Sequence, residues 1–169
     1  PCQSSAASDV YKRQINDFAF SDLDGDGDQD IIAASTYDDK ITWLKNNGAA
    51  DPTFAATTIA TSADGPRDVF VADIDSDGDM DIVAASREDD TISWYENDGM
   101  PGGSFTAADI ATSADGAESI DLADLDGDGD LDIVSVSMDD DTVAWYENNG
   151  AINPTWTAID IATNVDEAE

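Results

Sequence analysis

Three short runs of this chain alternate aspartate with glycine and apolar residues in one fixed pattern. The first, residues 22–30, carries carboxylates at its first, third, fifth, seventh and ninth positions and glycine at its sixth. Ca²⁺ takes six to eight oxygen ligands at roughly 2.3–2.6 Å, and a short loop can wrap around it only where the backbone turns sharply. Gly27 permits such a turn because glycine tolerates a positive φ. The spacing therefore predicts a loop that holds a hard cation.

The same pattern recurs at residues 73–81 and 124–132, each copy 51 residues after the one before. In every copy we expect carboxylate ligands from the first, third, fifth and ninth positions, while the seventh residue contributes its backbone carbonyl rather than its carboxylate. Up to three Ca²⁺ ions per chain are therefore expected. The predicted metal residues are Asp22, Asp24, Asp26, Asp28 and Asp30, then Asp73, Asp75, Asp77, Asp79 and Asp81, and finally Asp124, Asp126, Asp128, Asp130 and Asp132.

A plainer interpretation of these acidic runs is a solvated surface or a disordered acidic tail. Random acidic tracts, however, do not alternate aspartate with glycine and apolar residues in three equal registers. Five carboxylates within nine residues would also repel one another strongly unless a cation lay among them. The pattern favours metal binding over simple solvation.

Composition excludes several other classes of function. The 169 residues suffice for one domain of ordinary size, and their formal net charge is −33. Nucleic acid is not expected as a partner, because phosphate binding needs lysine and arginine. No apolar run approaches the roughly 18 residues of a membrane span, so no membrane insertion is expected. Repulsion among so many negative charges destabilises the compact state, so bound cations would stabilise the fold. Adaptation to a salty medium is the alternative explanation for the acidic composition.

Residues 1–14 differ from the corresponding part of the later units. Where those units have Ile-Ala-Thr-Ser-Ala-Asp-Gly, this segment has a run that contains two of the six basic residues of the chain. The segment resembles a translated sequencing-adaptor remnant, and it has neither the apolar core nor the cleavage site of a signal peptide. We interpret it as a non-repeat leader that takes no part in the fold.

A repeat of about 50 residues is typical of propellers and solenoids. In each unit, period-two alternation before the acidic run indicates a half-buried strand, and the apolar run after it indicates a strand buried on both faces. A turn with two aspartates, a strand that carries tryptophan, an Asn-Gly or Asp-Gly turn and a closing strand complete the unit. The chain is thus predicted to be all-β, with four-stranded units at residues 15–65, 66–116 and 117–169, the last including the start of a fourth.

These features resemble the FG-GAP/VCBS-type repeat, in which Asp-x-Asp-x-Asp-Gly-x-x-Asp precedes an apolar strand of a four-stranded unit. The resemblance covers residues 15–169. It implies blades of a β-propeller of the integrin α-chain type, with Ca²⁺ held by the aspartates named above. The Trp-Tyr-Glu-Asn strand is similar to the bacterial branch of the family, which implies a secreted or cell-surface protein.

Other calcium motifs fit less well, and the number of units is small for a propeller. An EF-hand loop needs a bidentate glutamate at its twelfth position, whereas that position holds Ala33, Ala84 or Ser135. Propellers usually close with four to eight blades. Three units therefore predict a fragment of a larger array, whose partners include neighbouring blades, or a chain that closes by self-association.

Trp43, Trp94 and Trp145 hold one position of each unit. We expect them to pack between blades rather than to form a ladder that stacks sugars. Residues that differ between units are better candidates for ligand contact, because function on a repeat fold resides in its variable loops. These are the pairs 36–37, 87–88 and 138–139, with the linkers 49–53, 100–104 and 151–155.

A binding or adhesion scaffold for a protein or glycan ligand is the function that these features favour, and catalysis is not expected. The chain has no histidine, the commonest general base. Its carboxylates could serve a glycosidase, but they repeat identically, whereas a catalytic centre normally occurs once. The alternatives are a spacer stiffened by Ca²⁺ that binds no ligand, and an accessory domain of a carbohydrate-active enzyme.

Overall fold

The computed structural model describes residues 15–100 and 102–163. The predicted leader and the last six residues of the predicted third unit lie outside the described residues. Within these ranges the chain forms twelve strands and no helix, so the predicted all-β class is confirmed. Accordingly, the described residues include no helix that is long and apolar enough to cross a membrane.

The strands form three four-stranded antiparallel sheets, one for each repeat, and in each sheet the strands are adjacent in chain order. The first sheet contains β1 (Ile15–Ser21), β2 (Asp30–Ser35), β3 (Lys40–Asn46) and β4 (Phe54–Ala60). The second contains β5 (Pro66–Ala72), β6 (Asp81–Ser86), β7 (Thr91–Asn97) and β8 (Phe105–Ala111). The third contains β9 (Ala117–Ala123), β10 (Asp132–Ser137), β11 (Thr142–Asn148) and β12 (Trp156–Thr163).

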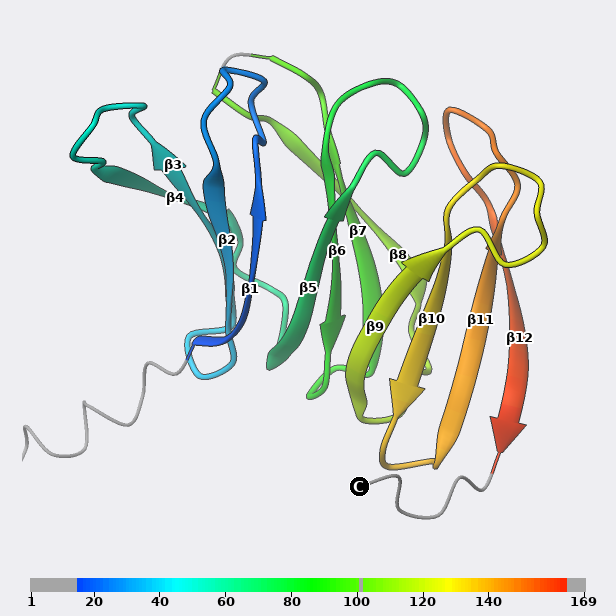
Figure 1. Cartoon of the computed structure of the whole chain (residues 1–169). Coiled ribbons are helices and arrows are strands. Elements are labelled where there is room, and N and C mark those ends of the chain that lie inside the picture. Colours follow the sequence, from blue (N-terminus) through cyan, green and yellow to red (C-terminus); the bar gives the residue numbers. More distant parts are fainter. Residues whose placement is uncertain (1–14, 101, 164–169) are drawn as a thin grey trace, which may run out of the picture.

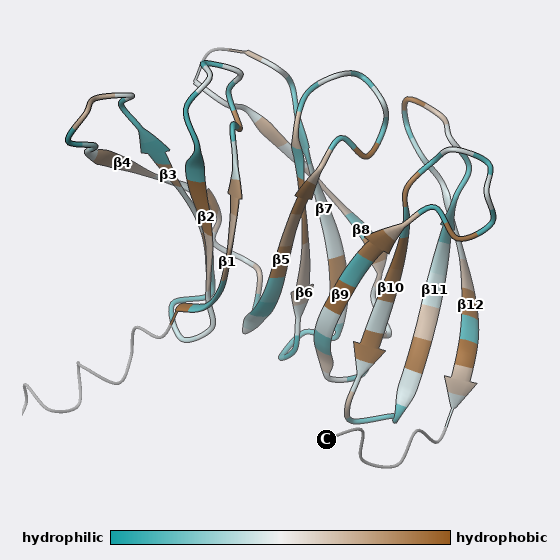
Figure 2. Cartoon of the chain, viewed as in Figure 1, coloured by the Kyte–Doolittle hydropathy of each residue, from teal (hydrophilic) through white to brown (hydrophobic). Residues whose placement is uncertain are grey.

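The three sheets stand side by side like propeller blades, in an open arrangement that does not close into a ring (Figure 1). The first strand of each sheet contacts the first strand of the next, β1 against β5 and β5 against β9. The second strands also contact the first strand of the following sheet, β2 against β5 and β6 against β9. The most hydrophobic residues lie mainly on the strands, several of which also carry hydrophilic residues, while the loops are mostly hydrophilic (Figure 2).

The core lies between the blades rather than inside any one of them. In β6, Ile82 and Ala84 belong to the cluster shared with the first sheet, while Val83 and Ala85 belong to the cluster shared with the third. All four side chains are fully buried. Successive residues of a strand point to opposite faces, so the apolar run predicted to be buried on both faces supplies two separate cores.

Two of the repeated tryptophans lie at the seams, by which we mean the packed contacts between neighbouring blades. Trp43 is 2% exposed, and its ring meets that of Phe105 from the next blade edge-on, with centroids 6.4 Å apart. Trp94 is also buried, in the second core, where Trp156 packs. The expectation that Trp43 and Trp94 pack between blades is confirmed, whereas Trp145 on the third blade is only half-buried.

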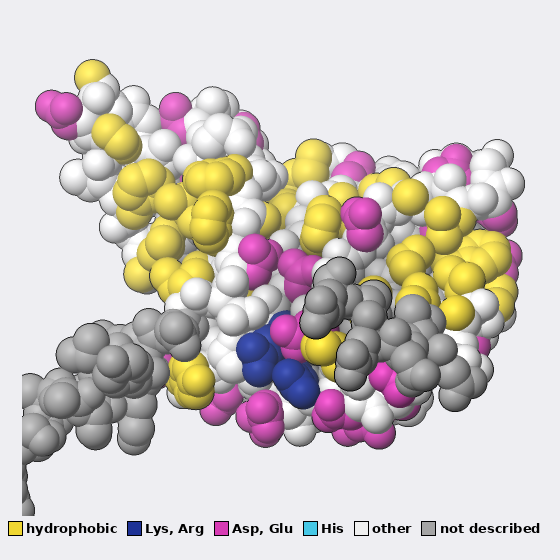
Figure 3. Space-filling model, turned by 60° about the horizontal axis from the view of Figure 1, so that its bottom comes forward, with side chains coloured by type: hydrophobic (Ala, Val, Ile, Leu, Met, Phe, Trp, Pro, Cys, Tyr) yellow, Lys and Arg dark blue, Asp and Glu magenta, His cyan; other side chains and the backbone are white. Residues whose placement is uncertain are grey.

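The outer side of β1 carries exposed aromatic side chains. Phe18 and Phe20 are 55% and 60% exposed and meet edge to face. The residues at the same positions of the second blade, Val69 and Val71, pack into the first core instead. Figure 3 shows hydrophobic side chains gathered on this side of the first sheet.

At the end of the sheets opposite the acidic runs, aspartates of one blade bind the backbone of the connection that leads to the next blade. Asp39 and Asp90 end the turns between the second and third strands at positive φ values of 52° and 59°. Their carboxylates accept hydrogen bonds from the N–H groups of Gly65 (3.2 Å) and Gly116 (2.9 Å). Aspartate tolerates this left-handed conformation better than most residues, which explains the paired aspartates of the predicted turn.

Candidate metal centre

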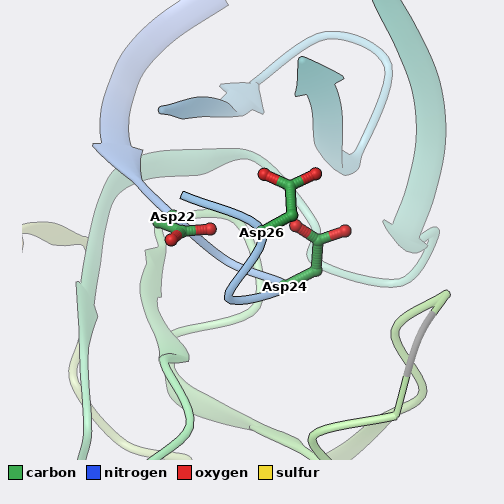
Figure 4. Close-up of side chains that lie close together, drawn as sticks. All are labelled: Asp22, Asp24 and Asp26. Atoms are coloured by element: carbon green, nitrogen blue, oxygen red, sulfur yellow. The ribbon is translucent and has the colours of Figure 1, made fainter. Parts of the chain in front are cut away.

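Each acidic run forms a loop that leaves the first strand of its sheet and enters the second. We call residues 22–30, 73–81 and 124–132 the first, second and third acidic loops. In each loop, carboxylate oxygens of the first, third and fifth aspartates lie within 4.8 Å of one another. Figure 4 shows this group for the first loop, where Asp22, Asp24 and Asp26 lie together. Three of the four predicted carboxylate ligands are thus brought together in every unit.

Backbone hydrogen bonds inside the loop hold these carboxylates in place. The first aspartate accepts a bond from the N–H of the sixth residue, as Asp73 does from Gly78 at 3.1 Å. The fifth aspartate accepts one from the seventh residue, as Asp77 does from Asp79 at 2.9 Å. The glycine at the sixth position has a φ of 94° to 104° in the three loops. The predicted role of this glycine in the sharp turn is confirmed.

The seventh aspartate points away from this group. In all three units its carboxylate packs against the glycine of the Asn-Gly or Asp-Gly turn after the third strand, so closely that any side chain at the glycine would overlap it. The pairs are Asp28 with Gly48, Asp79 with Gly99 and Asp130 with Gly150. This position agrees with the expectation that the seventh residue offers its carbonyl and not its carboxylate; metal contact by that carbonyl stays a prediction.

The ninth aspartate is the most buried member of each loop. Asp30, Asp81 and Asp132 are 0%, 1% and 0% exposed. Both oxygens of Asp81 accept backbone hydrogen bonds, one from Asn97 at 2.8 Å and one from Ile74 at 3.2 Å. This side chain therefore fastens the acidic loop to the end of the third strand, a role that sequence reasoning missed. Each carboxylate oxygen has a further lone pair beside the one that accepts its backbone bond, and metal contact by the ninth aspartate stays a prediction.

Burial changes the proton affinity of these groups. Desolvation raises the pKa of Asp81 to about 6, although the N–H groups of Asn97 and Ile74 oppose the rise. Desolvation likewise raises the pKa of Asp75, and the negative charges of Asp77, Glu96 and Asp73 raise it further. An adjacent positive charge would reverse both trends.

Several buried oxygens of the loops have no hydrogen-bond partner in the protein. Asp75 is 6% exposed, and its Oδ2 is unpaired; Oδ1 of Asp73 is unpaired as well. The Oδ1 atoms of Asp22 and Asp24 in the first loop are also buried without a hydrogen-bond partner. A buried carboxylate oxygen without a partner is unfavourable. The all-oxygen donor set and these unpaired oxygens fit a hard divalent cation such as Ca²⁺.

The three loops are nevertheless different. In the third, Asp124, Asp126 and Asp128 are all exposed, whereas Asp75 of the second is buried. In the first, the ammonium group of Lys45 contacts Oδ2 of Asp24 and lies 3.5 Å from Oδ2 of Asp26. The repeating spacing gave no sign of these differences.

The variable pairs of the sequence lie at the opposite end of the blades. Arg87 donates to Glu118 at 3.3 Å and to Asp139 at 3.1 Å, both on the third unit. Thr36 donates its hydroxyl to the carbonyl of Pro66 at 2.8 Å. Figure 3 shows basic side chains gathered among acidic ones on the face in view. These pairs therefore connect blades, and ligand contact by them stays a prediction.

Sequence comparison decides the family to which these blades belong. The FG-GAP-like repeat family matches residues 22–84, 73–135 and 124–167, which together span nearly the whole described fold. The chain belongs to the FG-GAP-like repeat family. No curated protein matches the chain.

Among solved structures, the FG-GAP-like chain is similar to a lectin of Agrocybe aegerita, described as specifically recognising non-reducing terminal N-acetylglucosamine. The TM-score is 0.59 and the sequence identity 24%, over 88% of this chain and 39% of the lectin chain. The chain thus spans about two fifths of the length of that structure. At this identity the likeness supports the fold, and the open three-blade arrangement corresponds to part of a larger propeller-like structure.

Proposed function

We propose that this FG-GAP-like chain is a calcium-stiffened binding module of a secreted or cell-surface protein, with a scaffold role and no catalysis. The unpaired Oδ2 of Asp75 carries the calcium part of the proposal. This atom is buried inside a group of three carboxylates. Asp73, Asp75 and Asp77 would hold the ion in the second loop, with their equivalents in the other loops.

Bound Ca²⁺ would neutralise the repulsion within each loop and fix its shape. Extracellular modules bind Ca²⁺ with a Kd of about 10⁻⁴–10⁻³ M, so millimolar Ca²⁺ outside cells would load such sites. A ligand that binds only the folded state at a tenfold excess over its Kd stabilises that state by about 1.4 kcal/mol. Ca²⁺ should be preferred over Mg²⁺, because the larger ion tolerates an irregular oxygen cage.

Calorimetric titration of the full chain with Ca²⁺, combined with thermal melts in Ca²⁺ and in chelator, tests the metal site. We expect saturable binding and a higher melting temperature in Ca²⁺, and both effects should weaken in Asp75→Asn. Asp51→Asn is the matched control, since Asp51 is exposed in the loop after β3. Identical melts with and without Ca²⁺ up to 10 mM would refute the calcium proposal.

A glycan is the ligand class that we propose for the module. A groove lies between the first and second acidic loops, lined by residues that include Phe20, Gln29, Asp79 and Met80. Phe20 and Met80 are 60% and 37% exposed, so apolar surface lies beside amide and carboxylate groups. Such a combination suits a sugar ring, which has apolar C–H faces and hydroxyl edges. The lectin similarity agrees with this choice at the level of fold.

A glycan array that includes chains ending in N-acetylglucosamine tests this part, with Phe20→Ala expected to reduce retention at least tenfold. Phe54→Ala serves as control, because Phe54 is also exposed but lies outside the groove. Retention of a protein ligand with no glycan retained would favour a protein-binding scaffold. Retention of neither would favour the spacer alternative, and hydrolysis of a glycan substrate would favour the enzyme-associated alternative.

A further inference from the structure

One cation of the protein itself lies inside an acidic loop. Lys45 is the penultimate residue of β3, and its ammonium group reaches the carboxylates of Asp24 and Asp26. The side chain of Asp24 is only 5% exposed, whereas that of Lys45 is 38% exposed, so the ammonium closes the buried carboxylate off from the solvent side. The ammonium also lies 5.8 Å from the centre of the Trp43 ring, within the range of a cation–π interaction. Two separate contacts thus hold Lys45 over the first acidic loop.

The same position carries the opposite charge in the other two units. Glu96 and Glu147 are the penultimate residues of β7 and β11, as Lys45 is of β3. The strand pairings confirm the equivalence, since Lys45, Glu96 and their neighbours pair with corresponding residues of β4 and β8. The negative charge of Glu96 is felt by Asp75 in the second loop. Each unit thus carries one charged side chain at this strand position, positive once and negative twice.

This difference in charge changes how strongly each loop should attract a divalent cation. In the second loop, the buried Asp75 keeps an unpaired Oδ2, and an extra carboxylate lies nearby. In the first loop, the corresponding Asp24 already has Lys45 on its Oδ2, although its Oδ1 is still without a hydrogen-bond partner. An ion bound among Asp22, Asp24 and Asp26 would lie beside an ammonium group and be repelled by it. Lys45 must move away before the first loop can bind a divalent cation.

We propose that Lys45 is a built-in counter-ion that replaces the divalent cation in the first acidic loop, so that the chain binds Ca²⁺ only in its second and third loops. The inference rests on the proposed calcium function, because it assigns that function to two of the three loops. It lowers the expected number of ions from three to two. It also makes the first loop the one that keeps its shape when Ca²⁺ is scarce.

Reciprocal charge exchange tests the proposal by calorimetric titration of the full chain with Ca²⁺. The wild type should bind two ions, Lys45→Glu should bind three, and Glu96→Lys should bind one. Lys40→Glu makes the same change of charge at the start of β3, away from the loop, and should still bind two. Lys45→Met, which removes the positive charge without adding a negative one, should raise the affinity of the first loop for Ca²⁺ at least tenfold over that of the wild type.

A second measurement does not depend on bound metal. In chelator, Lys45→Met should lower the melting temperature by about 2–4 °C, because the first loop loses the cation that pairs with Asp24, whereas Lys40→Met should leave it unchanged. Three ions of similar affinity in the wild type would overturn the Lys45 inference while the calcium function stands. No ion in any variant would overturn the calcium function. An unchanged melting temperature of Lys45→Met in chelator would overturn the counter-ion role itself.

Discussion

The side-chain amide of Asn97 donates a hydrogen bond to the backbone carbonyl of Leu23, 74 residues earlier, at 3.0 Å. The same amide donates to Met80 of its own acidic loop at 3.1 Å, while the backbone N–H of Asn97 binds Asp81. One asparagine therefore joins the first acidic loop to the second. Asn148 repeats the arrangement with Ile74, joining the second loop to the third. Hydrogen bonds from two asparagines thus connect each acidic loop to the next.

Replacement of Asn97 by alanine should weaken the seam between the first two blades. Asn97 is 3% exposed, so its loss removes a buried donor from the carbonyl of Leu23 and a partly buried one from the carbonyl of Met80. We expect the free energy of unfolding in urea to fall by about 2–3 kcal/mol. Asn46→Ala is the control, because Asn46 is half-exposed and the hydrogen bonds of its side-chain amide are to Gln29 and Gly48, both in its own unit. An equal loss in both variants would contradict the role of Asn97 as a bridge between loops.

Within one acidic loop, the aspartates should separate into two functional kinds. Asp81→Ala leaves two buried N–H groups without an acceptor, so it should destabilise the protein by about 3 kcal/mol in chelator as well as in Ca²⁺. Asp77→Ala should weaken Ca²⁺ binding and leave the melting temperature in chelator nearly unchanged, since Asp77 is exposed. Thermal melts of both variants in both conditions test this. Equal destabilisation by both in chelator would refute the division.

The sequence predicts the repeated part of this arrangement and misses what joins the repeats. The 51-residue repeat and the alternation of apolar with polar residues predict the sheets. The run that forms β6 predicts a strand buried on both faces, because apolar residues follow one another in it and so point to both faces. The spacing of Asp73, Asp75 and Asp77 likewise predicts the carboxylate group. The bond from Asn97 to Leu23 was not predictable, since a contact across 74 residues depends on how blades stack. The sequence shows lysine in the first unit at the position where the other two units have glutamate. Only the structure shows that the ammonium group of Lys45 lies against the carboxylates of the first acidic loop.

Comparing alanine variants of two equivalent phenylalanines should show how much one contact between blades contributes to the free energy of unfolding. Phe54 and Phe105 begin β4 and β8 at equivalent positions, but only Phe105 meets a tryptophan, Trp43 of the preceding blade. Phe105→Ala should lower the free energy of unfolding by about 2–3 kcal/mol, since it removes a buried aromatic contact. Phe54→Ala should change it by less than about 1 kcal/mol because Phe54 is 43% exposed. Urea titration of the two variants tests the difference, and similar losses would show that the seam contributes little.

Asp68 should make the folded state less stable as the pH rises, whereas an aspartate in a salt bridge makes it more stable. It lies on β5 and accepts hydrogen bonds from the N–H of Ile120 and the hydroxyl of Ser119, both at 2.8 Å. Burial raises the pKa of Asp68, and the neighbouring Asp17 raises it further, although the two hydrogen bonds oppose the rise. The folded protein thus binds a proton here at pH values where the unfolded chain has released it. This contribution is fully present below about pH 4 and is lost as the pH rises through the raised pKa of Asp68.

Asp68→Asn removes this titration but keeps an oxygen that can accept the bond from Ile120. In chelator, the stability of Asp68→Asn relative to the wild type should therefore increase from pH 4 to pH 7. Urea unfolding at several pH values measures the difference, with Asp51→Asn at an exposed loop position as the control. The difference should stay constant with pH for the control, because Asp51 lies outside the seam. A relative stability of Asp68→Asn that stays flat or falls as the pH rises would show that Asp68 is charged in the seam at no energetic penalty.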